Sequence, residues 1–93
     1  MQGRIVDYLL NLGVTEDDIE NILKSNNFEL VEFKQIRECI NLLIVYGYPK
    51  EDVSTLLSVN PYIMFYNPTN LEKLLIGLSP NLEEKLKENP YLI

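Results

Sequence analysis

Carboxylates are the side chains of this 93-residue chain whose clustering first raises the question of a reactive site. They gather in three short groups: Glu16, Asp17 and Asp18, then Glu51 and Asp52, then Glu83 and Glu84. None of these groups has the alternating Asp/Asn ligands around a glycine that build a calcium-binding loop. Each group instead falls in the first turn of an expected helix, where negative side chains are favoured by the helix dipole. We therefore interpret them as solvated residues at helix starts rather than as metal-binding or acid–base groups.

Nucleophilic chemistry is disfavoured by the residue types that the chain contains. Cys39 is the only cysteine, and there is no histidine to serve as its base or as a zinc ligand. Cys39 stands among Ile36, Ile40 and Leu43 at helical spacing, which predicts a buried structural thiol. No glycine-rich phosphate loop is present. The sequence thus predicts a protein that is not an enzyme, with no catalytic residue, metal site, cofactor or small-molecule substrate.

Composition and charge narrow the class of protein further. The chain carries 8 basic and 14 acidic residues, which give a formal net charge of −6 and a pI near 4.5. Such a protein repels DNA and RNA on average. A hydrophobic content of 46% is typical of a folded chain, and the length predicts a single domain spanning residues 1–93.

The expected location follows from three features of the sequence. A single cysteine excludes an intrachain disulfide. The first apolar stretch is interrupted by Asp7 and Asn11, unlike a signal peptide. No stretch approaches the roughly 18 apolar residues that a membrane span requires. We expect an intracellular, soluble, cytoplasmic protein that does not enter a membrane.

Internal repetition is the strongest structural signal in the chain. The segment from Gly13 to Phe28 recurs from Gly47 to Tyr62, and a shorter third copy runs from Gly77 to Tyr91. A period of about 34 residues indicates stacked helical units rather than one globular motif. The fold class predicted from this period is an all-α helical-repeat solenoid of about two and a half helix pairs, of either superhelical hand.

Two types of helix are expected to alternate along the chain. Type B helices are expected at Arg4–Leu12, Lys34–Tyr46 and Asn70–Ile76, where apolar residues recur at helical spacing. A type A helix follows each of Gly13, Gly47 and Gly77, which gives the order B-A-B-A-B-A. We expect each glycine to end its B helix in the left-handed conformation. Thr15, and Ser79 with Pro80, are expected to begin A helices as capping residues.

Each type A helix is expected to end at an asparagine followed by an aromatic residue. The three segments are Asn26-Asn27-Phe28, Asn60-Pro61-Tyr62 and Asn89-Pro90-Tyr91. Proline disfavours helix in the residue before it, so these segments stop the helix and turn the chain. We expect the aromatic ring to fill the gap between helices, with the next two residues extending the segment as a short 3₁₀ turn.

The recurring pattern resembles the repeat of the mitochondrial transcription termination factor (mTERF) family. The shared features are an apolar helix ending in Leu-Gly or Tyr-Gly, a polar stretch, a leucine-containing helix and Asn60-Pro61-Tyr62-Ile63-Met64 or Asn89-Pro90-Tyr91-Leu92-Ile93. The resemblance covers nearly the whole chain. It implies two α-helices and a 3₁₀ turn per repeat, a curved all-α superhelix, and a basic concave face that binds a nucleic-acid backbone.

Two sets of residues are candidate contacts. The candidate nucleic-acid contacts are the basic residues of the B helices: Arg4, Lys34, Arg37 and Lys73. Four cations neutralise few phosphates, so ordinary solvated charge is the alternative interpretation. The candidate partner surface comprises the expected open ends and the unassigned tyrosines: Leu9, Leu10, Tyr46, Tyr48, Tyr66, Tyr91, Leu92 and Ile93.

The sequence therefore favours a non-enzymatic helical-repeat interaction module that binds a protein partner, or another copy of itself, through its open ends. Stacked repeats bury faces that they cannot bury alone, so an uncovered end tends to bind another surface. The alternative is transcription-related nucleic-acid binding through a weakly basic face of the B helices.

Overall fold

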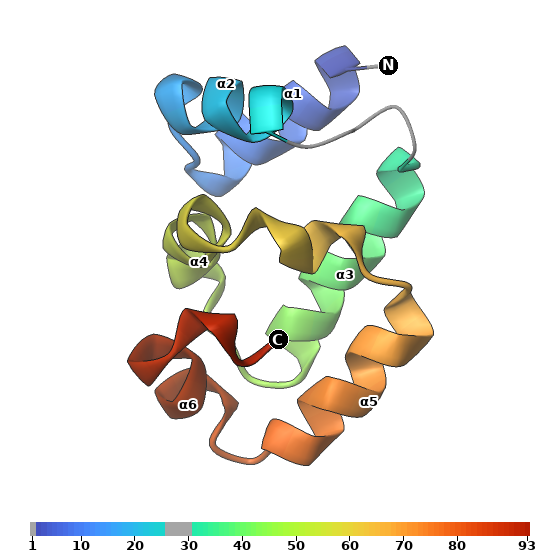
Figure 1. The fold of residues 1–93 in the computed structure, drawn as a ribbon, viewed down its shortest axis with the longest axis vertical. Coiled ribbons are helices and arrows are strands. Elements are labelled where there is room, and N and C mark those ends of the chain that lie inside the picture. The colour runs from blue at the N-terminus through green and yellow to red at the C-terminus, as the bar shows by residue number, and fades with distance from the viewer. Residues whose placement is uncertain (1, 26–30) are drawn as a thin grey trace.

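This computed structural model describes residues 2–25 and 31–93 of the chain (Figure 1). The described residues form six α-helices and three short 3₁₀ helices, joined by turns. In order they are α1 (Gln2–Leu12), α2 (Glu16–Ser25), α3 (Phe33–Val45), η2 (Lys50–Asp52), α4 (Val53–Val59), η3 (Pro61–Phe65), α5 (Pro68–Leu78), α6 (Leu82–Glu88) and η4 (Pro90–Leu92). The described residues contain no strand. The all-α prediction is confirmed, and an α-helix lies in each of the six regions where one was expected. The first asparagine–aromatic segment, Asn26 to Phe28, lies outside the described residues.

The turns after α1 and α3 are two copies of one structure. Gly13 and Gly47 have φ angles of 101° and 107°, the left-handed region that glycine adopts without a Cβ clash. The backbone N–H of Gly13 donates to Leu10 O at 3.0 Å, and that of Gly47 donates to Ile44 O at 3.1 Å. The residue after each glycine also donates back into its helix: Val14 to Leu9 O at 3.0 Å and Tyr48 to Leu43 O at 2.9 Å. The prediction of glycine helix ends is confirmed at both positions.

The third turn departs from that pattern, and the prediction there was wrong. Gly77 lies inside α5, and the helix continues to Leu78. Ser79 is the C-cap of α5 rather than the N-cap of α6, and the Ser79–Pro80 peptide bond is cis. The residue that precedes α6 is Asn81. A single glycine costs a helix only about 1 kcal/mol, so α5 continues through Gly77.

The segments after α4 and α6 form 3₁₀ helices, as expected, but their aromatic rings point outward. Tyr62 is 61% exposed and Tyr91 is 65% exposed, so neither ring fills the gap between helices. Ile63 and Met64 are fully buried and fill that gap instead. Residues i and i+3 of a 3₁₀ helix share a face. Tyr62 accordingly lies beside Phe65, with ring centroids 6.4 Å apart.

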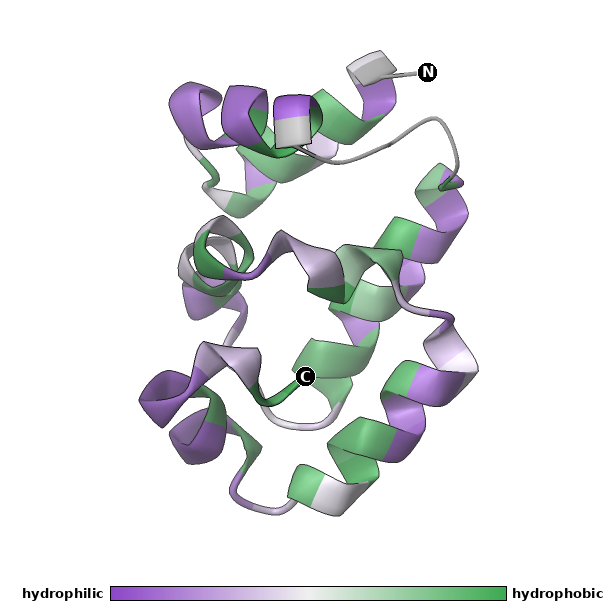
Figure 2. Cartoon of the chain, viewed as in Figure 1, coloured by the Kyte–Doolittle hydropathy of each residue, from purple (hydrophilic) through white to green (hydrophobic). Residues whose placement is uncertain are grey.

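The core lies between helices that are distant in sequence. Helices α1 and α2 contact each other and α4, α3 packs against α5 and η3, and α5 contacts α6. Figure 2 shows hydrophobic residues on the inner sides of α3 and α5, with hydrophilic residues along the outer sides of α2 and α6. The Cα radius of gyration is 12.4 Å, close to the ~12 Å expected for a compact folded chain of this length. Each helix therefore buries its apolar side against another helix or a 3₁₀ segment.

Candidate interaction surfaces

The two described Asn-Pro-Tyr segments meet at the joint between α4 and η4. Asn60 is only 2% exposed, and its side-chain amide donates to Pro90 O at 3.0 Å and to Ile93 O at 3.4 Å. In return the Tyr91 hydroxyl donates to Val59 O at 3.2 Å. These bonds join the end of α4 to the segment that follows α6. We call residues 60–63 the inner Asn-Pro-Tyr segment and residues 89–92 the outer one; the outer segment thus covers the end of the inner one.

The outer segment itself is left uncovered by the described residues. Asn89, which corresponds to Asn60, is exposed, and its side chain caps its own turn by accepting from Tyr91 N at 3.1 Å. Leu92 is 44% exposed, whereas the corresponding Ile63 is fully buried. The end of the molecule at η4 therefore exposes Asn89, Tyr91 and Leu92. The counterparts of the first and last of these, Asn60 and Ile63, are buried.

The structure divides the predicted partner residues into exposed and buried ones. Leu10 (39% exposed), Tyr91 and Leu92 are exposed as expected, while Tyr46, Tyr66 and Ile93 are half-buried. Leu9 and Tyr48 are buried, so the prediction that they face a partner was wrong. Leu9 lies on the inner side of α1. Tyr48 follows the left-handed Gly47, whose turn brings it back onto the core, and burial raises the pKa of its hydroxyl.

Two of the four predicted nucleic-acid contacts lie near one aromatic ring. The guanidinium carbons of Arg4 on α1 and Arg37 on α3 lie 5.2 and 5.7 Å from the centroid of Phe33. Tyr8 packs edge-on against the same ring, at 5.4 Å between centroids. The ring faces of Phe33 attract both cations, which join the first helix to the third. We call Arg4, Arg37 and Phe33 the arginine cluster.

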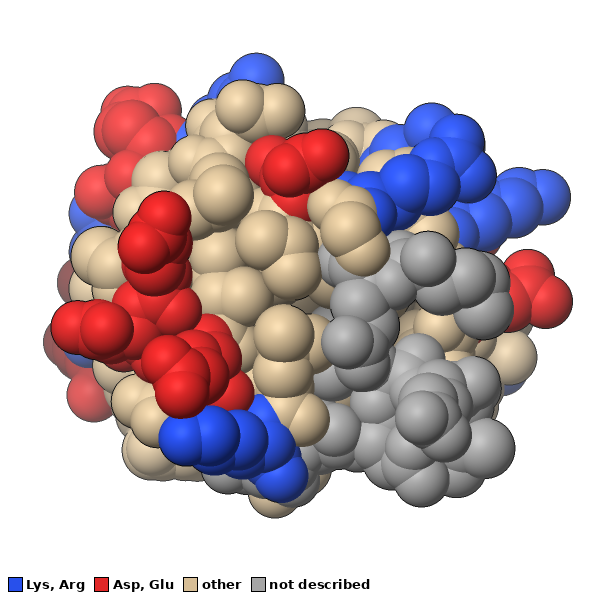
Figure 3. Space-filling view, turned by 90° about the horizontal axis from the view of Figure 1, so that it is seen from above, with Lys and Arg blue, Asp and Glu red and all other residues tan. Residues whose placement is uncertain are grey.

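The other two predicted contacts, Lys34 and Lys73, lie outside the arginine cluster and on different helices. Lys34 is adjacent to Phe33 in sequence and lies 3.9 Å from Glu38, a loose, exposed ion pair. Lys73 is exposed on α5 and is not part of the arginine cluster. Figure 3 looks down on the α1–α2 end and shows acidic side chains mainly on the left and a group of basic ones on the right, with further basic side chains at the top and beside the acidic group. The arrangement separates charge within one face without making the molecule basic.

The acidic groups act as helix-start residues and as joints between helices. Thr15 Oγ1 accepts from Asp18 N at 3.2 Å, as a capping residue does, while Asp18 accepts from Ser58 of α4 at 2.9 Å. Lys87 on α6 contacts Asp52 at 2.8 Å and Glu83 at 2.7 Å, and these two hydrogen-bonded carboxylates raise its pKa. Within residues 2–25 and 31–93 no group of three potential ligands is positioned to hold a metal ion.

Cys39 is buried, in agreement with the sequence-based interpretation. Its side chain is fully covered, and the thiol donates to Tyr66 O at 3.3 Å. Burial, with a smaller contribution from the negative charge of Glu38, raises its pKa from 9.0 to about 11. A thiol that holds its proton in this way is a poor nucleophile at neutral pH.

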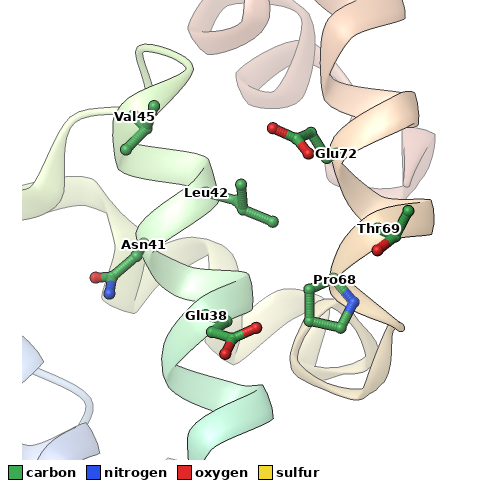
Figure 4. A pocket seen from close by; sticks show the side chains of 7 residues that line it. All are labelled: Glu38, Asn41, Leu42, Val45, Pro68, Thr69 and Glu72. Atoms are coloured by element: carbon green, nitrogen blue, oxygen red, sulfur yellow. The ribbon is translucent and has the colours of Figure 1, made fainter.

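An open groove of about 370 Å³ runs between α3 and α5 (Figure 4). Leu42, Val45 and Pro68 supply its apolar surface, and Glu38 and Glu72 supply a carboxylate from each helix. In Figure 4, Leu42 and Glu72 point toward each other across the groove, and Glu38 lies near Pro68 at the other end. The Tyr46 hydroxyl donates to Glu72 Oε2 at 2.8 Å, a hydrogen bond that raises the tyrosine pKa. Helix α3 thus fixes the position of a carboxylate on α5.

Several of these residues were not identified from the sequence. Asn60 was expected only to stop a helix, and Glu38, Val45 and Glu72 had no assigned role. The side chain of Gln35, also unassigned, donates to Phe65 O at 3.2 Å and Tyr66 O at 2.9 Å and fixes the chain after η3. Of these residues, only Asn60 had a signal in the sequence that could have pointed to its role, because asparagine before proline recurs at Asn89.

Comparison with known proteins identifies no relative: no protein-family model, curated protein or solved structure matches this chain. None of the described helices combines the length and apolar content needed to cross a membrane.

Proposed function

We propose that this protein is a non-enzymatic helical-repeat module that binds a protein partner, or a second copy of itself, through its open ends. In this proposal the helices form a short solenoid of the kind found in the mTERF-like repeat family, which the sequence resembles. The proposed partner is a protein rather than a nucleic acid, because a net charge of −6 repels nucleic acid on average.

The observation that carries the proposal is the difference in burial between the corresponding residues Ile63 and Leu92. Ile63 is fully buried beneath neighbouring segments, whereas Leu92 is 44% exposed beside the 65% exposed Tyr91. Clustered apolar exposure of this kind marks interaction surfaces in soluble proteins, and tyrosine is enriched there. A partner that covered η4 as α3 and α4 cover η3 would bury Leu92, as Ile63 is buried.

Self-association is tested by light scattering of the wild type, Leu92→Asp and Ile76→Asp, a control at another exposed apolar residue, over a wide range of concentrations. We expect the wild type and Ile76→Asp to form dimers or larger species as concentration rises, and Leu92→Asp to remain monomeric. A wild type that is monomeric throughout contradicts self-pairing.

In that case the same three proteins serve as baits for a protein partner. Proteins retained by the wild type and by Ile76→Asp but lost with Leu92→Asp support the proposal. Equal retention by all three baits contradicts a role for the η4 end.

A second candidate function, nucleic-acid binding, is favoured by the arginine cluster. Arg4 and Arg37 make no ion pair with the carboxylates of the described residues, and both guanidiniums lie together beside Phe33. Arginine binds phosphate through paired hydrogen bonds.

Fluorescence anisotropy of labelled duplex and single-stranded oligonucleotides tests this candidate at low and physiological salt. Binding through the cluster predicts an affinity that falls steeply with salt and is lost in the double variant Arg4→Glu/Arg37→Glu. The control Lys50→Glu/Lys85→Glu changes net charge equally elsewhere and should retain binding. Unchanged anisotropy at low salt, or equal loss in both variants, contradicts the candidate.

A further inference from the structure

We propose that the groove between α3 and α5 is a docking site for an amphipathic segment of a partner protein that carries basic residues beside its apolar ones. The proposal rests on the interaction function proposed above, but it uses a side of the molecule distinct from the η4 end. It assigns the chemistry of the segment: one or two apolar side chains for the floor of the groove and lysine or arginine for its walls.

Most of the apolar part of the site comes from α3, with Pro68 added by α5. Leu42 and Val45 are three residues apart, so they lie on one face of the helix, and Glu38, four residues before Leu42, lies on the same face. Val45 is 76% exposed, the largest exposure among the apolar side chains described as exposed. The space beside it, about 370 Å³, lies toward the lower end of the roughly 300–1,000 Å³ typical of ligand pockets. It has room for one or two side chains of a segment lying along the helices.

The charged part of the site is acidic on both sides. Glu38 comes from α3 and Glu72 from α5, and no lysine or arginine is among the lining residues. One oxygen of Glu72 accepts the Tyr46 hydroxyl, so the carboxylate is held in place while its other oxygen remains available. Among the described residues, the ion pair of Glu38 is the loose contact to Lys34 at 3.9 Å. Charge complementarity therefore selects a cationic segment rather than an acidic one.

The shape of the site favours a helical or extended peptide over a compact molecule. The groove lies between two helices and is open along its length, as are the grooves in which amphipathic helices place apolar anchors. Asn41 and Thr69 add one uncharged polar group from each wall, which can bond to the backbone or side chains of the bound segment. Hydrogen bonds, an apolar floor and two carboxylates together specify the partner's chemistry.

The first test uses a fluorescein-labelled peptide of about 15 residues, with leucines at helical spacing and lysines elsewhere, as the probe. Its counterpart with glutamate in place of lysine is the charge control. Anisotropy at physiological salt should show saturable binding of the leucine–lysine peptide and none of the leucine–glutamate peptide. Equal binding of the two peptides, or no binding of either, overturns the proposal.

The second test locates the binding on the molecule. Glu38→Gln/Glu72→Gln and Val45→Ser should each weaken peptide binding by about tenfold or more. A lost charge-assisted hydrogen bond or apolar contact costs about 1.4 kcal/mol or more, and 1.4 kcal/mol corresponds to a factor of ten in affinity. The matched control Glu51→Gln/Glu84→Gln removes the same charge from exposed sites outside the groove. Far-UV circular dichroism checks that every variant is folded.

The outcomes separate this proposal from the one for the η4 end. Peptide binding that survives in Leu92→Asp, weakens in the groove variants and persists in the control supports the groove. Equal weakening in Glu51→Gln/Glu84→Gln means that the peptide follows net charge, and it overturns the proposal. Loss of peptide binding only in Leu92→Asp places the site at η4 and also overturns it.

Discussion

The inner and outer Asn-Pro-Tyr segments have nearly the same local structure but opposite surroundings. In both, a short α-helix ends at an asparagine and a 3₁₀ helix begins at the following proline. The tyrosine of each is exposed to a similar extent, 61% and 65%. The difference lies in the asparagine and in the residue after the tyrosine, which are buried in the inner segment and exposed in the outer one.

This contrast shows that sequence pattern determines the turn and that the neighbouring segment determines its burial. Asn60 and Asn89 both stand at the ends of their helices, but only Asn60 has another segment within reach of its amide. The same residue type is therefore a joint in one place and a local cap in the other. Mutations at matched positions should expose this difference directly.

The largest expected effect is at the apolar position after tyrosine. Ile63→Ala should lower the free energy of unfolding by about 2–5 kcal/mol, because the side chain is fully buried and leaves a cavity. Leu92→Ala at the matched position should cost less than about 1 kcal/mol. Urea unfolding followed by circular dichroism measures both values. Equal costs would show that the two segments are covered to the same degree in solution.

The asparagines give the next largest contrast. Asn60→Ala should cost about 1–3 kcal/mol, since it removes the donor for Pro90 O and Ile93 O from a buried site. Asn89→Ala removes one exposed bond to Tyr91 N and should cost about 0.5 kcal/mol or less. The same unfolding experiment distinguishes them. An Asn60→Ala variant as stable as Asn89→Ala would contradict the joint.

The chain just after η3 contacts a titratable thiol, which makes the free energy of unfolding depend on pH. Cys39 donates to Tyr66 O just after η3, and its pKa is raised to about 11 in the folded state. The unfolded chain loses this proton near 9.0, so wild-type stability should fall as pH rises from 9 to about 11. The contribution is fully present below pH 9. Cys39→Val should show a shallower fall over this range, and parallel curves would contradict a protected thiol.

The smallest expected effect concerns the two ion pairs of Lys87, one within α6 and one to Asp52 at the end of η2. Lys87→Gln removes the contacts to Asp52 and Glu83, which are about half exposed and therefore weak. The thermal midpoint should fall by less than in any variant above, and the fall should shrink as salt is added. A large, salt-independent fall would show that Lys87 acts through packing rather than charge.

Local features of the fold could be predicted from the sequence, and contacts between distant segments could not. Gly13 and Gly47 were identified because the apolar pattern ends at a residue that tolerates a positive φ. The same argument failed at Gly77, since glycine is also permitted inside a helix and nothing local shows that α5 continues. Helix order, proline stops and 3₁₀ turns follow from neighbours in sequence, so they were predictable.

The candidate surfaces were less predictable because they depend on how helices pack. Leu9 looks like an end residue in the sequence, but α1 turns its side chain toward the core. The groove exists only because α3 and α5 pack side by side and bring Glu38 and Glu72 to opposite walls. Proximity in sequence gives no information about either arrangement. The arginine cluster likewise brings together residues from α1 and α3.

The bonds made by Asn60 have a consequence for how this protein can evolve. Its amide binds the main-chain oxygens of Pro90 and Ile93, and every amino acid carries such an oxygen. Side chains in this segment can therefore be exchanged over generations without loss of either bond, provided that the backbone keeps its path. The demand that these two bonds place on side-chain identity therefore falls on one asparagine, and it leaves the side chains of the surface that it holds in place free to vary.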